Sequence, residues 1–278
     1  ANFQDAVNLW FSDEANATYT YGHISDWNTS AVTYMYGAFS WRGTFNEDIS
    51  SWNVSSVTNM NRMFFRTSQF NQPIGNWDVS AVTDMDWMFH KSGFNQPIGD
   101  WNVSSVAKME YMFTDGSFNQ DISTWDVSST SSLEKMFNYA PLSNNNKGMI
   151  HKTFSSNPNW PYDWSEFVVY EPITNANFQD AVNLWFSDEA NATYTFGHIS
   201  DWNVSLVTDM SEAFKDRTTF DENISDWDVS NVTSMNHMFA NATSFNQAIG
   251  NWEVSAVTNM QSTFAGSSFN QPIGDWNV

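Results

Sequence analysis

The chain has 278 residues with 31 acidic and 10 basic side chains, which gives a formal net charge of −21 at pH 7. This charge repels nucleic-acid phosphates and anionic lipid headgroups, and the apolar runs are too short to span a bilayer, so neither nucleic-acid binding nor direct membrane insertion is expected. A hydrophobic content of 41 % with 17 % aromatic residues excludes a disordered chain, and the absence of cysteine excludes disulfides and thiolate metal sites.

The first predicted element is an amphipathic helix within residues 1–20. Asn2 is placed to cap it, and Phe3, Val7 and Trp10 follow at spacings that put them on one face. Such a face suits an N-terminal cap over the apolar end of a repeat array. The same segment recurs unchanged at 176–195, which is 175 positions later and indicates a tandem duplication of a whole module.

A shorter unit of 24 or 25 residues repeats inside each module. Fixed apolar positions with this period are typical of stacked units that each bury an apolar face against the next. We therefore predict that the repeats, residues 24–138 in the first module, form a solenoid. The isoleucine that opens each unit is Ile24, Ile49, Ile74, Ile98, Ile122, Ile199, Ile224, Ile249 or Ile273.

Each repeat of 24 or 25 residues is predicted to contain one short strand and one short helix. In the second repeat, Trp52 and Val54 alternate about a polar residue as in a strand. Val57, Met60 and Met63 recur at the spacing of a helix face. The rows of Met and Phe are predicted to fill the core, because these side chains pack well in irregular interiors. The expected fold class is therefore an α/β solenoid with helical caps, built from tandem modules.

The repeated motif, I-S-x-W-x-V-S-x-V-T-x-M-x-x-M-F, resembles the repeat of the BspA-like leucine-rich-repeat surface proteins. The resemblance covers residues 24–138 and 199–278, and I-x-x-W-x-V stands where a leucine-rich repeat has L-x-x-L-x-L. It implies leucine-rich-repeat-like, right-handed coils and an exposed surface or secreted protein without enzymatic activity. The fifth repeat departs from the motif at Thr130-Ser-Ser-Leu133, as is typical of an array that nears its end.

The closing segments of the first module read as a second cap and a linker. Residues 139–165 contain Ile150 and Phe154 in an amphipathic stretch, followed by Trp160 and Trp164, and complete a first module of residues 1–165. Residues 166–175 are the expected linker. The second module spans 176–278 and stops in the middle of a repeat, so we expect the natural array to continue, because an open apolar coil aggregates.

One polar position per unit forms a candidate binding strip, which we call the Asn/Asp ladder. It lies between the Trp and the following Val, where a strand residue points out of the sheet. A functional interpretation is a strip that binds carbohydrate, a cation or a partner. The alternative is a solvent-facing position at which Asn and Asp exchange and stack. Its members are Asn28, Asn53, Asp78, Asn102, Asp126, Asn203, Asp228 and Glu253.

Glycosylation sequons are abundant. Four of them arise simply because Trp-Asn-x-Ser is the repeat consensus, whereas Asn16 and Asn191 lie outside the repeat, in an expected turn between cap and repeat. The candidate sites are Asn16, Asn28, Asn53, Asn102, Asn191, Asn203, Asn223, Asn231 and Asn241.

No catalytic constellation is evident. His23 and His198 are one position in two modules, and the carboxylates recur with the repeat, so no residue pair stands out as acid and base. No cofactor is expected. Weak calcium binding is left open at acidic turns such as Asn46-Glu47-Asp48, Asp121 and Asp221-Glu222.

The sequence therefore predicts a non-enzymatic structural or adhesive protein, extracellular or at the cell surface, as a segment of a longer array that forms a stalk or filament. Its expected partners are further copies of the module or chain. The alternative function is a binding module that recognises a glycan or a host surface protein through the Asn/Asp ladder.

Overall fold

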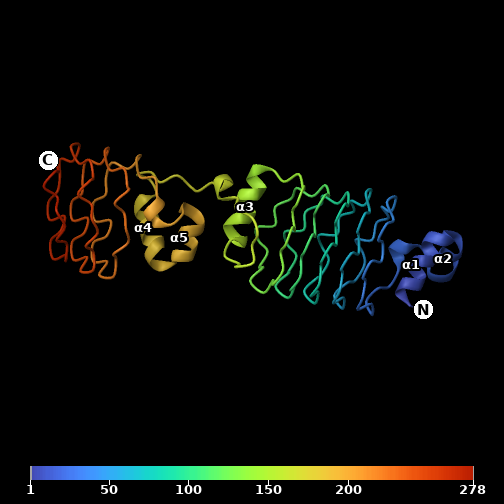
Figure 1. The fold of residues 1–278 in the computed structure, drawn as a ribbon. Helices are drawn as coiled ribbons and strands as arrows, with labels where there is room; N and C mark the ends of the chain where they lie inside the picture. The colour runs from blue at the N-terminus through green and yellow to red at the C-terminus, as the bar shows by residue number, and fades with distance from the viewer. Residues whose placement is uncertain (1, 278) are drawn as a thin grey trace. The chain divides into compact units, whose positions relative to one another are not determined.

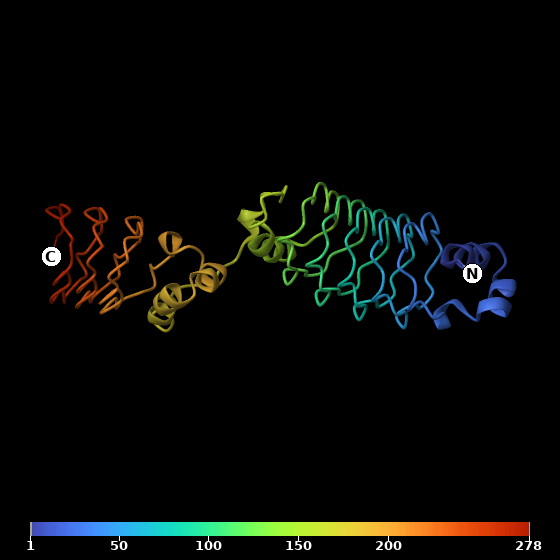
Figure 2. The ribbon, with the colours of Figure 1, turned by 90° about the horizontal axis from the view of Figure 1, so that it is seen from below.

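The computed structural model describes residues 2–277 and divides into two compact units, Ala1–Val169 and Tyr170–Val278 (Figure 1). We call them the first and second unit. In each unit helices precede a row of stacked coils, and a coil is one repeat of the chain (Figures 1 and 2). No helix within residues 2–277 is both long and apolar enough to cross a membrane.

The helices lie at the ends of the coil rows. In the first unit they are α1 (Phe3–Ser12), α2 (Glu14–Tyr21), η1 (Ile24–Asp26), α3 (Asn144–Phe154) and η2 (Ser165–Phe167). In the second unit they are α4 (Phe178–Ser187), α5 (Glu189–Phe196) and η3 (Ile199–Asp201). The single helix predicted within 1–20 is two helices, because Asp13 ends α1 and its carboxylate accepts the backbone N–H of Asn16 in α2.

The expected α/β solenoid is wrong. The described residues contain no strand, and within the coils the only helical segments are the short η1 and η3 that open the first coil of each unit. Neighbouring coils are joined by isolated parallel β-bridges and otherwise consist of turns and extended chain. The bridges pair one residue per coil. They join Tyr34 to Asn59, Asn59 to Asp84, Asp84 to Lys108 and Lys108 to Ser132 in the first unit, and Asp209 to Ser234 and Ser234 to Asn259 in the second.

The backbone amides explain why the expected helix does not form. The N–H groups of Met60, Arg62 and Phe64 donate to carbonyls one coil further on, each at 2.9 Å. The N–H groups of Met63 and Phe65, between them, donate to carbonyls three residues back in the same coil. Arg62 has a φ of +58°, in the left-handed region that a right-handed helix excludes. Every second amide thus ties two coils together, and the helical spacing of the Met residues serves packing instead.

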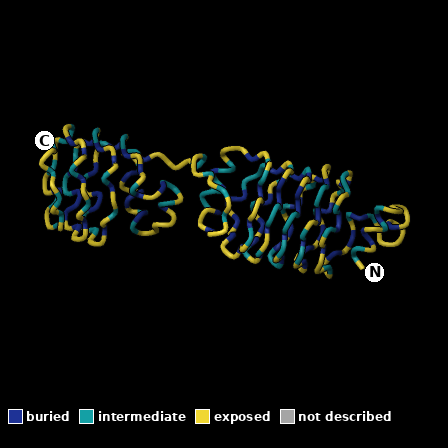
Figure 3. The backbone as a smooth tube through the Cα atoms, viewed as in Figure 1, coloured by how far each residue is buried: buried dark blue, intermediate teal, exposed yellow. Residues whose placement is uncertain are grey.

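The apolar rows form the interior of each coil stack (Figure 3). Phe64 and Phe70 stack within one coil with ring centroids 4.0 Å apart, and Phe64 stacks on Phe89 of the next coil at 5.5 Å. Met60, Phe64 and Phe70 are fully buried. The prediction that Met and Phe fill the core is confirmed.

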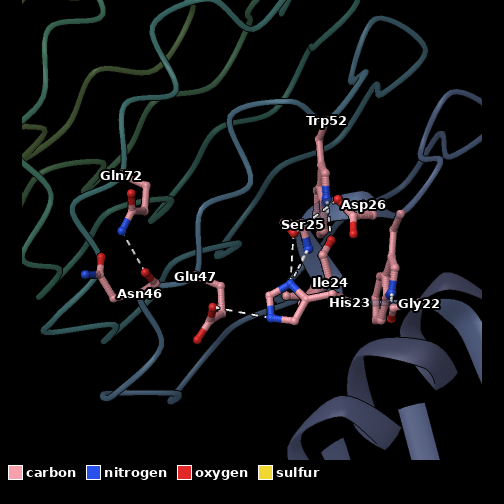
Figure 4. Close-up of polar contacts among 10 residues, drawn as sticks. Gly22, His23, Ile24, Ser25, Asp26, Asn46, Glu47, Trp52 and Gln72 are labelled. Atoms are coloured by element: carbon pink, nitrogen blue, oxygen red, sulfur yellow. Dashed lines mark hydrogen bonds and ion pairs between the residues drawn. The ribbon is translucent and has the colours of Figure 1, made fainter. Parts of the chain in front are cut away.

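The Trp of each coil has a second function besides packing. The Nε1–H of Trp52 donates to the carbonyl of Ile24 in the preceding coil at 2.9 Å (Figure 4). The same bond recurs along both units, for example from Trp125 to Ile98 at 2.9 Å. In the first coil, Trp27 donates to Gly22 at 3.0 Å. Phe and Leu lack this donor, so the position requires Trp.

Helix α1 covers the first coil. Asn2 accepts the backbone N–H of Gln4 and so caps the helix. Trp10 is buried, and Phe3 packs edge-on against Trp52 with centroids 5.7 Å apart. The apolar end of the coil row is therefore closed by a helix face.

The other end of the first unit is closed by α3 and the segment that follows it. The ring centroids of Trp164 and Phe137, a residue of the last coil, are 5.7 Å apart. The hydroxyl of Tyr162 accepts the backbone N–H of Phe137 at 2.9 Å. The buried amide of Asn157 donates to the carbonyls of Val127 and Thr130. This segment therefore supplies an acceptor, the Tyr162 hydroxyl, and a donor, the Asn157 amide, to backbone groups of the last coil.

Candidate recognition surface

The eight residues of the Asn/Asp ladder are exposed, and each forms a turn. Oδ1 of Asn53 accepts both the backbone N–H of Ser55 at 3.1 Å and its hydroxyl at 2.7 Å. Asn and Asp share this acceptor oxygen, which explains their exchange along the ladder. The corresponding pairs are Asn28 with Ser30, Asp78 with Ser80, Asn102 with Ser104, Asp126 with Ser128, Asn203 with Ser205, Asp228 with Ser230 and Glu253 with Ser255.

The same turn keeps the acidic members of the ladder ionised. Hydrogen bonds from the side chain and the backbone N–H of Ser80 lower the pKa of Asp78. Equivalent serine contacts lower the pKa of Asp126, Asp228 and Glu253. Part of the negative charge of the protein is therefore fixed at this position of the coils.

The nine sequon asparagines are all exposed, in three kinds of environment. Asn16 and Asn191 lie in helices α2 and α5, so their expected placement in a turn between cap and repeat is wrong. The side-chain amide of Asn231 donates to the Ser205 carbonyl, and that of Asn241 donates to Asp216. At Asn53 and its equivalents the turn uses the oxygen rather than this nitrogen, which is the atom that a glycan would modify.

The turns considered for calcium are engaged in bonds between or within coils. Asn46 accepts the Asn71 N–H through Oδ1, and its carbonyl accepts the Gln72 side chain at 2.7 Å (Figure 4). Asp221 makes the same two contacts in the second unit, and Asp121 accepts the Ser123 N–H. Within residues 2–277, no group of three or more His, Asp or Glu side chains is arranged to hold a metal ion.

His23 faces a single carboxylate. Its Nε2 lies 3.9 Å from the carboxylate of Glu47, and its Nδ1 lies 2.8 Å from the hydroxyl of Ser25 (Figure 4). Because its ring also packs on Trp10 with centroids 4.9 Å apart, it joins the cap to the first coils.

A second surface, which the sequence reasoning missed, lies on the bridge positions of the first unit and the turns that follow them. Aromatic and cationic side chains gather there from successive coils. We call it the aromatic face, and it consists of Tyr34, Tyr36, Trp41, Arg62, Phe65, Arg66, Trp87, His90, Tyr111 and Lys135.

One row of the aromatic face runs along the coil stack. Nη1 of Arg62 donates to the hydroxyl of Tyr36 at 3.0 Å, and its guanidinium lies 5.5 Å from the ring centroid of Trp87. Trp87 stacks on Tyr111 with centroids 4.1 Å apart. The ammonium of Lys135 then donates to the Tyr111 hydroxyl at 2.9 Å. Aromatic rings and cations therefore support one another over successive coils.

A second row lies beside it. The guanidinium of Arg66 lies 4.1 Å from the ring centroid of Trp41, and Trp41 contacts Phe65 edge-on at 5.5 Å. Phe65 stacks on His90 at 5.1 Å. His90 is almost fully buried, and burial lowers its pKa. The ring is therefore neutral at pH 7 and packs as part of the row.

The second unit provides a control for what the fold requires. Residues 175 positions apart are equivalent, and core positions such as Phe39 and Phe214 are identical and buried in both units. Eight of the ten residues of the aromatic face have an equivalent in the second unit, and all eight are replaced. The equivalents are Asp209 for Tyr34, Ser211 for Tyr36, Asp216 for Trp41, His237 for Arg62, Ala240 for Phe65, Asn241 for Arg66, Ser262 for Trp87 and Ala265 for His90.

The backbone makes this replacement informative. Trp41, Arg62 and Trp87 have φ values of +65°, +58° and +60°, where a bulky side chain is a conformational outlier. At two equivalent left-handed positions the second unit carries Asp216 and His237, residue types that tolerate this region better. The first unit therefore keeps large side chains where the fold favours smaller polar ones.

The aromatic face borders an open depression of about 760 Å³ beside the first turn of α1. Trp41 and Tyr34 are 65 % and 59 % exposed at its edge. It is lined by Asn2, Gln4, Tyr34, Tyr36, Gly37, Ser40, Trp41, Arg62 and Phe65. The equivalent depression of the second unit has no aromatic lining and is lined instead by Gln179, Asn183, Ser211, Glu212, Ala213, Lys215, Asp216, Arg217 and Asn236.

Incompletely bonded polar atoms cluster at the same place. Among residues 2–277, the buried side-chain atoms that lack a hydrogen-bond partner are Asn61 Oδ1, Arg66 Nε and His90 Nδ1. Arg66 and His90 belong to the aromatic face, and Asn61 precedes Arg62 in the same coil. Nearly all buried polar atoms in native proteins have a hydrogen-bond partner. This surface therefore differs from the rest of the coil stack in its hydrogen bonding.

Acidic side chains lie next to the aromatic face on the bridge positions. The carboxylate of Asp84 accepts the side-chain amides of Asn59 and Asn61. Oδ1 of Asp86 accepts the backbone N–H of Glu110 at 2.7 Å, and burial raises the pKa of Asp86 to about 6. A position-by-position comparison of the two modules is the sequence signal for this surface, except at Tyr111 and Lys135, which have no counterpart within residues 176–278.

Comparison with known proteins gives one family. The family model described as Mycoplasma protein of unknown function, DUF285, matches residues 7–116, 76–156 and 180–278, and so covers most of both units. Searches of curated proteins and of solved structures found no significant match. The chain, with its stacked coils and duplicated module, belongs to the DUF285 family of proteins of unknown function.

Proposed function

We propose that the protein is a non-enzymatic adhesive protein of the cell surface or extracellular space. In this proposal the coil stack is the scaffold, and the aromatic face of the first unit is the recognition surface. The observation that carries it is the comparison between the units: the core is kept, while Trp41, Arg62 and Phe65 are replaced by Asp216, His237 and Ala240.

The structural component of the proposal is an array. The cap segments at 1–20 and 176–195 are identical, which favours a unit that is used repeatedly along a longer chain. Further copies of the module are then partners in a stalk or filament. The resemblance to BspA-like surface proteins and the exposure of all nine sequons favour an extracellular location.

The aromatic face is a better candidate for recognition than the Asn/Asp ladder. Ladder residues such as Asn53 occur in both units with the same turn-forming bonds, so the turn alone accounts for them. The aromatic face has no such account. Exposed Trp and Tyr beside Arg are the residue types that contribute most to binding at protein surfaces.

The test is retention of the full chain on a printed panel of oligosaccharides, mucin, collagen and laminin. The wild-type chain should be retained by at least one class of probe. A triple variant, Trp41→Asp with Arg62→His and Phe65→Ala, carries the residues of the second unit and should lose at least tenfold of that retention.

A matched variant removes the ladder instead, through Asn53→Ala, Asp78→Ala and Asn102→Ala. It should bind like the wild type, provided that circular dichroism shows both variants folded. Loss of retention in this variant alone would transfer recognition to the ladder, and failure of the wild type on every probe would reject the adhesive proposal.

A further inference from the structure

We infer that the depression beside α1 binds an acidic oligosaccharide, that is, a sugar chain with carboxylate or sulfate groups. The inference rests on the proposed function, because it names the ligand class of the same surface. Three features of the depression carry it: the kind of apolar surface, the neutral polar groups and the charge.

The apolar surface of the depression is aromatic rather than aliphatic. Tyr34 and Tyr36 lie with ring planes 17° apart and centroids 6.0 Å apart, and Trp41 stands beside them with 65 % of its surface exposed. Among the lining residues there is no Val, Leu, Ile or Met. Flat, exposed rings suit the C–H face of a pyranose, whereas an apolar peptide side chain requires an enclosed pocket.

Neutral hydrogen-bonding groups complete the lining. The side chains of Asn2, Gln4 and Ser40 line the same depression. Amide and hydroxyl groups both donate and accept, as the hydroxyl groups of a sugar do. Rings for the sugar face and amides for its edge are therefore present in one depression.

The charge of the depression selects for an anion. Its lining contains Arg62 and no carboxylate, although acidic residues outnumber basic ones by 31 to 10 in the whole chain. The guanidinium of Arg62 is held by the Tyr36 hydroxyl and by the ring of Trp87 before any ligand arrives. A planar guanidinium in a fixed position matches the geometry of a carboxylate or sulfate.

The second unit supports the assignment by contrast. Its equivalent depression replaces Gly37 with Glu212 and Trp41 with Asp216. Glu212 pairs with Lys215, which stands in place of Ser40, at 3.0 Å, whereas Asp216 adds a carboxylate and removes a ring. The fixed guanidinium is lost as well, because His237 stands in place of Arg62. We therefore assign acidic-sugar binding to the first unit only.

The experiment is calorimetric titration of the full chain at pH 8 with defined hexasaccharides. The probes are oligogalacturonate, its methyl ester, a heparin-derived hexasaccharide and cellohexaose. At least one acidic probe should bind at least tenfold more tightly than both neutral probes, and its affinity should fall as salt rises.

Variants place the binding in the depression. Arg62→His and Trp41→Asp should each weaken the acidic probe at least tenfold, and Arg62→Lys should retain part of the affinity. Tyr19→Ala removes a ring that is 93 % exposed on α2, outside the depression, and should change nothing. Circular dichroism melting shows whether each variant is folded, and Tyr34→Asp replaces Trp41→Asp if the latter is not.

The outcomes separate this inference from the proposed function. Equal affinity for acidic and neutral sugars, with no effect of Arg62→His, overturns the acidic ligand but keeps the adhesive role. If the protein binds only collagen or laminin, and does so through the aromatic face, the sugar ligand is rejected and the adhesive role is kept. Failure of every sugar and protein probe overturns both.

Discussion

At the scale of single residues, the repeated Trp joins two functions that another aromatic side chain would separate. Its ring fills the coil interior, and its N–H satisfies a carbonyl of the preceding coil, as Trp125 does for Ile98 at 2.9 Å. The Ile98 carbonyl also accepts the backbone N–H of Trp101, so the indole provides the second of two hydrogen bonds, and such a bond contributes about 0.5–1.5 kcal/mol. The Trp rows are thus hydrogen-bonding rows as well as packing rows.

Substitution of Trp125 by Phe tests this double function. The variant removes the donor to Ile98 and part of the ring volume at a site that is 1 % exposed, so we expect a loss of about 2 kcal/mol in the free energy of unfolding. Urea unfolding followed by Trp fluorescence measures the change. Trp41→Phe, on the exposed aromatic face, is the control and should change stability by less than about 0.5 kcal/mol.

Asp86 gives the protein a pH dependence of known sign. Its pKa is raised to about 6 by burial, so the folded state holds this proton more tightly than the unfolded state does. Below the pKa of the unfolded state, 3.8, the Asp86 carboxyl does not reduce the free energy of unfolding. That free energy falls as the pH rises from there to about 6, because the buried carboxyl then loses its proton.

Asp86→Asn removes that cost and keeps an oxygen to accept the Glu110 N–H. Because Asp86 is only partly buried, we expect a gain of about 1 kcal/mol at pH 7.5 after allowing for solvent screening. The gain should vanish near pH 4. Chemical unfolding at both pH values measures it, and an equal effect at the two would contradict the assigned cause.

At the scale of elements, the closing cap depends on one close approach. A Cβ at Gly148 in α3 would lie 2.1 Å from the carbonyl oxygen of Phe167, which belongs to the backbone of η2. Alanine is favoured over glycine in a helix by about 1 kcal/mol. Here the clash outweighs that preference, because a backbone atom cannot turn aside as a side chain can.

Gly148→Ala should therefore destabilise the first unit by about 1–3 kcal/mol. Asn145→Ala, on the exposed side of the same helix, should be neutral or slightly stabilising. Thermal melting of both variants decides between the two effects. If both substitutions raise the melting temperature, the cap does not depend on this contact.

The sequence was sufficient for some elements and insufficient for others. Fixed Ile, Trp, Met and Phe positions correctly indicate the period and the core, because burial leaves a pattern in one chain. The helix expected from Val57, Met60 and Met63 does not form, since every second N–H in that stretch donates to a neighbouring coil. Such bonds depend on the stack, and no local pattern reports them.

The aromatic face could not be predicted from local sequence patterns either, because it also depends on the stacking of the coils. Tyr36, Arg62 and Trp87 are about 25 residues apart in sequence and meet only when the coils stack. The Asn/Asp ladder drew attention because it repeats, yet repetition indicates a structural role such as the turn at Asn53. The surface proposed for recognition lies instead at positions that differ between the units while most of the core residues around them are the same.

At the scale of the whole molecule, one scaffold carries two different surfaces. If the aromatic face alone confers binding, moving it should move the activity. Six substitutions give the second unit the residues at equivalent positions of the first that line the depression: Asp209→Tyr, Ser211→Tyr, Glu212→Gly, Asp216→Trp, His237→Arg and Ala240→Phe.

We expect this variant to bind any probe that the first unit binds, with a stoichiometry close to two. Calorimetric titration gives the number of sites directly. The wild-type chain is the reference, and a folded variant that keeps one site per chain would show that further residues of the first unit are needed.

The regular bonds between coils also bear on how such genes change length. The coils offer their neighbours the same Trp donor, the same Asn or Asp acceptor and the same alternating amides. Duplication of one whole repeat in the gene therefore adds a coil that fits both neighbours, whereas a partial duplication shifts every bond out of register. Unequal recombination between repeats can thus lengthen or shorten the protein in whole steps, and each new copy starts with a surface open to divergence.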